Sequence, residues 1–349
     1  MSEHRSPLVV VIGSVNIDHV VVADAFPSPG QTILGRTAQV TLGGKGANQA
    51  VAAASGGVRT AMIARVGDDA EADTARAGLA ARGVDVRGVT AVPGAETGTA
   101  WITVAAGDNS IIVVPGANFA WQSEDDPTGG AGAEAAVVLA QLEIPLDVVQ
   151  RAAAACRGRF LLNAAPAAEL PDELISRCDV LIVNEHEQAV VSGRTGAEPA
   201  TEPAAVREAH AALRGRGAKA VVTTLGAAGV IVTDTDGTTT VLPAIPAEVV
   251  DTTGAGDAFT GVFAARLAAG DSILAAARLG IAAGSLAVRV AGAQQHHVDL
   301  ETLRAMAGTA RTTRTTDTAD TTPAPDPTGI TDPTDPTGVT GIAGIPGKD

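Results

Sequence analysis

The sequence predicts a three-layer α/β/α domain with a mostly parallel sheet, together with a small inserted β-sheet that forms a lid. Two observations support this fold class. Short apolar strands alternate along the chain with Ala-rich helical stretches, and parallel strands need such crossovers between them. Two segments, near residues 16–41 and 97–115, interrupt the alternation with strand-like sequence of their own.

The expected strands of the main sheet are short runs of Val, Ile and Leu bounded by Gly, Pro, Asn or Asp. They are Leu8–Val15, Thr60–Val66, Ala136–Leu142, Phe160–Asn163, Val180–Val183 and Ala220–Thr224, and a hairpin over Gly229–Leu242 follows them. Helices are expected at Ala47–Ala54, Asp147–Cys156 and Val206–Gly215. Strands that are apolar on both faces indicate helices on both faces of the sheet.

The two interrupting segments have the pattern of a separate small sheet. In the second segment, Thr99–Val104 and Ser110–Val114 flank a turn at Ala106–Asn109, which is a hairpin signal. Because both segments are inserted between strand–helix units, we expect them to stand beside the main domain as the lid.

The composition changes near Gly308, where Thr, Asp, Pro and Gly replace the apolar residues. Here the segment Asp326–Gly329 recurs as Asp335–Gly338. Such a sequence buries too little apolar surface to offset the entropy of ordering. Residues 308–349 are therefore predicted to be a disordered tail, and residues 1–307 the folded domain.

The bulk composition excludes several kinds of partner. The net charge of -15 disfavours nucleic acid, and 2% aromatic residues with no tyrosine offer no platform for stacked bases. No apolar run reaches the roughly 18 residues that span a bilayer. Asn16 and Asp18 interrupt the N-terminal run that resembles a signal peptide, and Cys156 and Cys178 fit reduced core residues. We expect a cytoplasmic protein without nucleic-acid or membrane partners.

The motif Asp251-Thr-Thr-Gly-Ala-Gly-Asp257 precedes an apolar helix at Ala258–Ala269. The small residues of Gly254–Gly256 allow backbone N–H groups at a helix entrance to approach an anion closely. A carboxylate in this place would repel a phosphate, but a base that takes a proton from an attacking hydroxyl needs such a position. The alternative is that Asp257 only caps the helix, and the segment alone does not decide between them.

Two further motifs carry polar side chains suited to a sugar. In Gly43-Gly-Lys-Gly-Ala-Asn48 the glycines either place Lys45 and Asn48 near a polyol or form a flexible turn before a helix. The motif is not a Walker A loop, since neither Ser nor Thr follows the lysine. Asn16 and Asp18 alternate after the first strand, so both could bind adjacent hydroxyls or form an Asx-turn.

Other polar residues follow later strands, at the edge of an open α/β sheet where ligands bind. Glu143 is one of them. Asn184-Glu-His-Glu187 has the form of a capping box, and its functional interpretation places both ends near Mg²⁺ and phosphate. Thr224–Gly229 borders a nucleotide pocket or forms an ordinary turn. His296 and His297 lack partners at metal-ligand spacing, so zinc is not expected.

Taken together, these motifs resemble the PfkB carbohydrate kinases, also called the ribokinase family. The resemblance runs from Leu8 to Arg304, and its first and last glycine-rich motifs are specific in combination. Val40–Ala54 and Gln141–Glu143 read almost as in the members that phosphorylate ribose. In the family's order, the matching motifs are Gly13–Asp18, Gly43–Asn48, Glu143, Asn184–Glu187, Thr224–Gly226 and Asp251–Asp257.

The resemblance implies a role for each matching position. The sugar would be held by Asn16, Asp18, Gly44, Lys45, Asn48, Glu143 and Asp257, with Asp257 as the base. Gly254, Ala255 and Gly256 would form the anion hole, and the nucleotide would lie against Asn184, Thr224, Gly226, Gly229 and Gly256. Glu187 would act near Mg²⁺. A K⁺ loop would use Asp251, Thr253, Ala287, Val290, Gly292 and His296, where the family usually has Ser at the last position.

By the same resemblance, the protein is expected to transfer the γ-phosphoryl group of ATP to O5 of D-ribose. Mg²⁺ would be the cofactor, K⁺ the activator, and the lid would form a homodimer. The alternatives within the family are deoxyribokinase, fructokinase and adenosine kinase, and a nucleoside kinase would want more aromatic residues than the chain has. Outside it, a sugar-binding regulator without activity is disfavoured by the intact Asp257 motif, and a dehydrogenase by the lack of a dinucleotide fingerprint.

Overall fold

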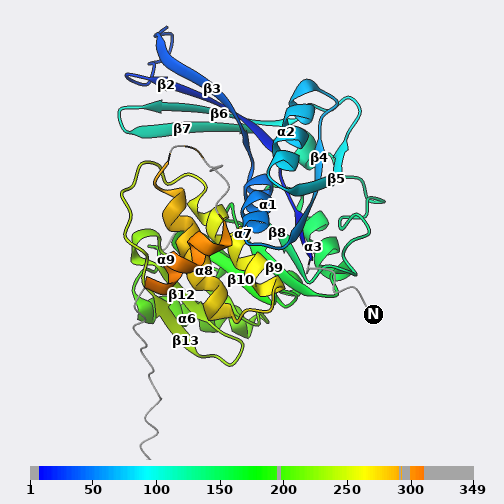
Figure 1. Ribbon diagram of the computed structural model, residues 1–349, viewed down its shortest axis with the longest axis vertical. Helices are drawn as coiled ribbons and strands as arrows, with labels where there is room; N and C mark the ends of the chain where they lie inside the picture. The colour runs from blue at the N-terminus through cyan, green and yellow to red at the C-terminus, as the bar shows by residue number, and fades with distance from the viewer. Residues whose placement is uncertain (1–7, 195–197, 291, 293–298, 310–349) are drawn as a thin grey trace, which may run out of the picture. The chain divides into compact units, whose positions relative to one another are not determined.

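The computed structural model describes residues 8–194, 198–290, 292 and 299–309, and two sheets are formed within them (Figure 1). The strands of the main sheet run, in spatial order, β13 (Thr239–Leu242), β12 (Val230–Thr233), β11 (Val221–Thr224), β10 (Val180–Asn184), β9 (Arg159–Asn163), β8 (Val137–Ala140), β1 (Leu8–Ile12), β4 (Arg59–Val66) and β5 (Val84–Ala91). The strands from β11 to β5 pair in parallel, and β12 and β13 pair antiparallel at one edge.

Each main-sheet strand expected from the sequence is confirmed, with small changes at its ends. The first strand ends at Ile12 rather than Val15, because the chain leaves the main sheet at Gly13 and Ser14. The edge strand β5 was not predicted. Its Val residues alternate with Asp85 and Arg87, and such a polar pattern is typical of a sheet edge.

The helices cover both faces of the main sheet. They are α1 (Lys45–Ser55), α2 (Ala70–Ala81), α3 (Leu146–Ala155), α4 (Asp172–Ile175), α5 (Glu185–Val191), α6 (Pro203–Gly215), α7 (Ala255–Ala268), α8 (Ile273–Ala287) and α9 (Leu300–Thr309). The three expected helices correspond to α1, α3 and α6. The apolar helix expected at Ala258–Ala269 begins earlier, at Ala255, so Asp257 lies in its first turn.

Alternate residues of the central strand β1 enter two separate cores. Val9 and Val11 pack in the core formed with α1, α2, α7 and α8, whereas Val10 and Ile12 pack in the core formed with α3 to α6. Side chains of a strand alternate between faces, so helices lie on each side of the sheet. The predicted three-layer α/β/α fold is confirmed.

The small sheet has the spatial order β3 (Gly35–Gly43), β2 (Asn16–Ala23), β6 (Gly98–Ala105) and β7 (Asp108–Val114). Strands β2 and β6 are parallel, and the other pairs are antiparallel. The turn is tighter than expected, because only Ala106 and Gly107 connect β6 to β7. Both residues have positive φ, at 54° and 82°, as a two-residue hairpin turn of this hand requires.

The part of the chain from residue 310 onward, which includes most of the predicted tail, lies outside the described residues. The last described element, α9, continues through Gly308 to Thr309 and packs Leu303 against α7 and α8. Within the described ranges, no helix combines the length and apolar character that a membrane crossing requires.

Candidate active site

The parallel strands bring polar residues to one edge of the main sheet. Ser14 follows β1, Glu143 follows β8, Asn163 ends β9 and Asn184 ends β10. The register pairs Asn184 with Thr224, the last residue of β11. Ligands of open α/β sheets bind beyond the carboxyl ends of the strands, so this edge is the candidate site.

Helix α7 begins at this edge with Gly254, whose φ of 77° is readily adopted only by glycine. Ala255 and Gly256 follow, and the first N–H groups of any helix have no partner inside the helix. A side chain added at Gly256 would meet no atom within 4 Å among the described residues. The helix entrance is therefore open enough for an anion to approach its N–H groups.

The carboxyl group of Asp257 is buried, with 7% of the residue exposed, in the first turn of α7. Two neighbouring side chains of α1 reach it. Asn48 Nδ2 lies 3.2 Å from Oδ2, and Gln49 Nε2 lies 2.9 Å from Oδ1. Each carboxylate oxygen thus accepts a hydrogen bond from an amide that is more than 200 residues away in sequence.

The glycine-rich start of α1 is joined to Ser14 and Glu143. Glu143 Oε2 accepts hydrogen bonds from Ser14 Oγ at 2.5 Å and from the backbone N–H of Lys45 at 3.0 Å. Ser14 Oγ also accepts the N–H of Gly46 at 3.2 Å. This arrangement fixes the path of the chain through Gly44, which is the N-cap of α1.

The Lys45 ammonium group is influenced by three carboxylates from separate parts of the chain. The negative charge of Asp257 raises the pKa of Lys45 above its ordinary value; burial opposes that shift, and Glu143 and Glu187 add to it. The lysine therefore remains a cation between the candidate base and the other acidic groups of the site. A cation in this place can stabilise a phosphoryl group.

Asp18 and Asn16 lie on the same face of β2, where the small sheet leaves the main domain. Gly43 on β3 and Gly98 on β6 flank them. A Cβ atom at Gly43 would lie 2.1 Å from Asp18 Oδ1, and one at Gly98 would lie 2.3 Å from Asn16 Oδ1. Burial, and then the charge of Glu143, raise the pKa of Asp18 to about 6, against the effect of His19.

Asn118 orients the amide of Asn16. Its Nδ2 donates to Asn16 Oδ1 at 2.7 Å and to the Val15 carbonyl at 3.2 Å, and its Oδ1 accepts the Val15 N–H at 2.8 Å. This hydrogen bond orients the Asn16 amide, so that its nitrogen can donate to a ligand. The sequence contained no motif that would have identified Asn118.

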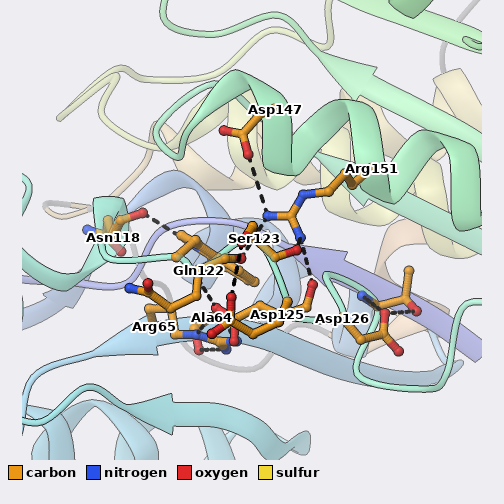
Figure 2. Close-up of polar contacts among 12 residues, drawn as sticks. Ala64, Arg65, Asn118, Gln122, Ser123, Asp125, Asp126, Asp147 and Arg151 are labelled. Carbon is orange, nitrogen blue, oxygen red and sulfur yellow. Dashed lines mark hydrogen bonds and ion pairs between the residues drawn. The ribbon is translucent and has the colours of Figure 1, made fainter.

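The loop that carries Asn118 is held against β4 and α3 (Figure 2). Trp121 Nε1 donates to the Asn118 carbonyl at 3.1 Å, and the Arg65 guanidinium lies 4.2 Å from the centre of the Trp121 ring. Arg65 pairs with Asp125 at 3.0 Å, and Arg151 donates to the backbone oxygen of Asp125 at 2.7 Å. Two arginines outside the site therefore anchor the segment that follows Asn118.

On the opposite side of the site, the expected capping box is present. Asn184 Oδ1 accepts the N–H of Glu187 at 2.8 Å, and Glu187 Oε2 accepts the N–H of Asn184 at 2.8 Å. Burial raises the pKa of Glu187, Asp257 adds to the shift, and Asn184 and Lys45 oppose it. Glu187 thus caps α5 and also lies within electrostatic reach of Lys45 and Asp257.

The turn after β11 begins at Thr224 and contains Gly226 and Gly229, both with positive φ. A Cβ atom at Gly229 would lie 2.1 Å from the Leu242 carbonyl oxygen, so the close approach of β13 is a structural reason for this glycine. At Gly226, by contrast, a Cβ atom would meet nothing within 4 Å in the part of the chain that the structure describes.

Asp251 organises the loop before α7. Its Oδ1 accepts the N–H of Thr253 and its Oδ2 the N–H of Gly292, both at 2.9 Å. Burial alone would raise the pKa of Asp251, but these two backbone hydrogen bonds hold it below its ordinary value. Val288, next to Ala287 at the end of α8, accepts the N–H of Val250 at 2.7 Å.

Of the remaining positions of the expected K⁺ loop, Val290 is 40% exposed, and His296 lies outside the described residues. Within the part of the chain that is described, no group of three or more His, Cys, Asp or Glu side chains is arranged to hold a metal ion. A cation at this site would therefore have ligands from the backbone or from a substrate as well as from side chains.

These features define a doubly wound α/β protein with a carboxylate-rich site at the carboxyl ends of its strands and an open helix entrance beside it. The model of the pfkB family carbohydrate kinases matches residues 6–299. The chain therefore belongs to the pfkB family of carbohydrate kinases.

Several named relatives are ribokinases, and a deoxyribokinase of Salmonella typhi, 32% identical over 299 residues, also matches. The chain is 38% identical over 294 residues to a ribokinase of Haemophilus influenzae, covering 81% of this chain and 93% of the relative. It is 38% identical over 296 residues to a ribokinase of Bacillus subtilis, covering 82% and 94%. Its fold matches that of Arabidopsis thaliana ribokinase complexed with ribose and ATP, with a TM-score of 0.79 and 33% identity over 87% of this chain and 99% of that one.

Proposed function

We propose that this protein transfers the γ-phosphoryl group of ATP to the 5-hydroxyl of D-ribose, giving D-ribose 5-phosphate and ADP. The observation that carries the proposal is the buried Asp257 carboxylate, which lies at the open entrance of α7 and within 3.2 Å of Asn48. The resemblance to ribokinases over more than four-fifths of the chain supports ribose as the sugar.

The sugar is proposed to bind between the small sheet and α1. Asp18 would accept hydrogen bonds from hydroxyls, and Asn16 would donate from its amide nitrogen, because Asn118 already donates to its oxygen. Asn48 would contribute its side-chain amide, Gly44 its backbone, and Glu143 its carboxylate. A ring of acceptors and donors of this kind suits a polyol and leaves the 5-hydroxyl to point toward Asp257.

In the proposed transfer, Asp257 takes the proton of the 5-hydroxyl as its oxygen attacks the γ-phosphorus and the bond from phosphorus to the ADP oxygen breaks. The transition state of such reactions is loose, so positioning and charge stabilisation matter more than strong basicity. The N–H groups of Gly254, Ala255 and Gly256 and the Lys45 ammonium would stabilise the charge on the transferring group. Losing one such donor typically costs about 3–4 kcal/mol of transition-state stabilisation.

The nucleotide is proposed to lie across the ends of β10 and β11, against Asn184, Thr224, Gly226 and Gly229. Glu187 would act near Mg²⁺, which supplies neutralisation of phosphate charge when bound. Mg²⁺ usually takes one or two protein carboxylates and completes its shell with water and phosphate oxygens. The single buried carboxylate of Glu187 fits this requirement, because the other ligands of the ion would be water and phosphate oxygens.

A monovalent cation is proposed to bind beside the loop of Asp251 and Thr253, with Ala287, Val290, Gly292 and His296 as the other expected positions. Two backbone hydrogen bonds keep the Asp251 carboxyl group ionised, so a negative charge is present there at neutral pH. A K⁺ ion at this place would stabilise the loop that leads into the anion hole.

The small sheet is proposed to act as a lid that excludes water, which would limit hydrolysis of ATP. It is also the proposed homodimer interface, since Val40, Trp101 and Ile112 lie on one face of this sheet and are 53–66% exposed. Exposed apolar residues gathered on one face of a sheet are typical of interaction surfaces. The proposal places the protein in the cytoplasm, and the free, buried Cys156 and Cys178 are compatible with reduced cysteines there.

A coupled assay of ADP release tests the proposal directly. Ribose, 2-deoxyribose, fructose and adenosine are compared at several concentrations, and the product is analysed by ³¹P NMR for a phosphate on C5. We expect the highest kcat/KM with ribose. A higher value with another acceptor would reassign the substrate, and binding of ribose without ADP release would identify a sugar-binding regulator.

A further inference from the structure

A chain of amide groups connects the backbone of β10 to the Asp257 carboxylate. Asn163 Nδ2 donates to the Ile182 carbonyl at 3.3 Å. Gln49 Nε2 donates to Asn163 Oδ1 at 2.9 Å and to Asp257 Oδ1 at 2.9 Å. Gln49 is 0% exposed and Asn163 is 7% exposed, so the chain lies inside the protein behind the carboxylate.

The acceptor at each end determines the orientation of both amides. A backbone carbonyl only accepts, so the nitrogen of Asn163 must face Ile182 and its oxygen must face Gln49. Asn163 Oδ1 in turn requires the nitrogen of Gln49, which has two hydrogens and can also donate to Asp257. The Ile182 carbonyl of β10 therefore determines, through Asn163, that the nitrogen of Gln49 faces the Asp257 carboxylate.

The opposite face of the Gln49 amide supports this interpretation. Gln49 Oε1 is buried, and no hydrogen-bond partner is found for it among the described residues. An unsatisfied buried oxygen is unfavourable, so the two hydrogen bonds of the nitrogen must outweigh it. If the amide were reversed, its oxygen would face both the carboxylate and Asn163 Oδ1.

We infer that Gln49 and Asn163 are positioning residues that hold Oδ1 of Asp257, so that Oδ2, which accepts only the longer hydrogen bond from Asn48, receives the proton of the sugar hydroxyl. The inference rests on the proposed function, in which Asp257 is the base. Both are positioning rather than catalytic residues, because the Gln49 nitrogen donates to Asp257 and Asn163, and the Asn163 nitrogen donates to the backbone of β10. They act only through Asp257, by fixing which of its oxygens faces the reacting hydroxyl.

Two single variants and their combination test the inference. In Gln49→Leu the carboxylate loses its fixed donor, and we expect kcat to fall by about 10- to 100-fold, as small misplacements of a reacting group do. The Kd of ribose, measured by calorimetry, should stay within about threefold. Asn163→Leu should lower kcat in the same way, because it removes the acceptor that orients Gln49. The double variant should be no slower than Gln49→Leu, since both belong to one chain of hydrogen bonds.

The pH dependence of kcat separates positioning from a general loss of stability. Loss of an N–H donor disfavours a charged carboxylate, so the acid limb of the kcat profile should move to higher pH in Gln49→Leu. Lys45 and Glu187, the charged groups that face Asp257, are unchanged in this variant. The matched control is Val149→Ala, a buried core change on α3, which should lower the melting temperature and leave kcat and its pH profile as in the wild type.

The outcomes distinguish this inference from the proposed function. Wild-type kcat and an unshifted acid limb in folded Gln49→Leu, with Asp257→Asn inactive, would overturn the inference and leave the base assignment in place. Full turnover by Asp257→Asn would overturn the proposed function instead. If Gln49→Leu does not fold, Asn163→Leu decides alone, and its wild-type kcat would refute the positioning role.

Discussion

Asp18 is charged at neutral pH at the expense of stability. Burial and the charge of Glu143 raise its pKa from 3.8 to about 6 in the folded protein. The pKa of Asp18 is higher in the folded than in the unfolded protein. Its favourable contribution to the free energy of unfolding is therefore present in full below pH 3.8 and is lost as the pH rises through about 6. A shift of this size corresponds to about 3 kcal/mol. In Asp18→Asn, which keeps the shape without the charge, we expect the free energy of unfolding at pH 8 to increase by about that amount.

The assay is urea unfolding of the sugar-free protein at pH 8 and pH 4.5, with Asp18→Asn beside the wild type. At pH 4.5 the gain should shrink to about 1 kcal/mol, since the folded-state carboxyl group is then mostly protonated. The KM for ribose should rise at the same time, because a charged acceptor is lost. Asp24→Asn is the control, since Asp24 is 70% exposed and paired with Arg36 at the surface. An equal gain at both pH values, or a loss at pH 8, would refute the reasoning.

Three further predictions concern other parts of the molecule. Burial, and then Arg214, lower the pKa of His210 to about 4. The contribution of neutral His210 to the free energy of unfolding is therefore present above pH 6.5 and is lost as the pH falls through about 4. His210→Gln should remove about 3 kcal/mol of this acid dependence from the unfolding free energy, and an unchanged dependence would contradict it. Turnover should be higher in KCl than in NaCl, and Asp251→Asn should abolish that difference; equal rates in the wild type would remove the K⁺ site. Ile112→Asp, at a position 66% exposed on β7, should yield monomers by light scattering, whereas a wild-type monomer would exclude the dimer.

Local sequence predicted the main sheet well, because buried parallel strands need apolar residues on both faces. Leu8–Ile12 and Val180–Asn184 are of this kind. The strand Val84–Ala91 did not stand out, because an edge strand tolerates Asp and Arg. The turn at Ala106 was misjudged by two residues, since Asp108 and Asn109 are turn formers that here begin a strand.

The site was predicted through its motifs rather than through distances. Spacing alone could not show that Asn48 meets Asp257, since the two are 209 residues apart. Only the resemblance to a family predicted that both residues belong to one sugar site. The resemblance did not predict a role for Gln49 or Asn163. A glutamine inside an Ala-rich helix has the same local sequence pattern whether it faces solvent or a carboxylate. Such partners emerge only when the packing of α1 against α7 is known.

The most direct test of the proposed chemistry is the turnover of Asp257→Asn with MgATP and ribose, measured together with the Kd of ribose by calorimetry. The amide keeps the size of the side chain but cannot accept the hydroxyl proton. We expect turnover to fall by about 10²- to 10⁴-fold, the usual contribution of a general base, while ribose binds within a few-fold of the wild type. Near wild-type turnover in this variant would contradict the role of Asp257 on which the proposed mechanism depends.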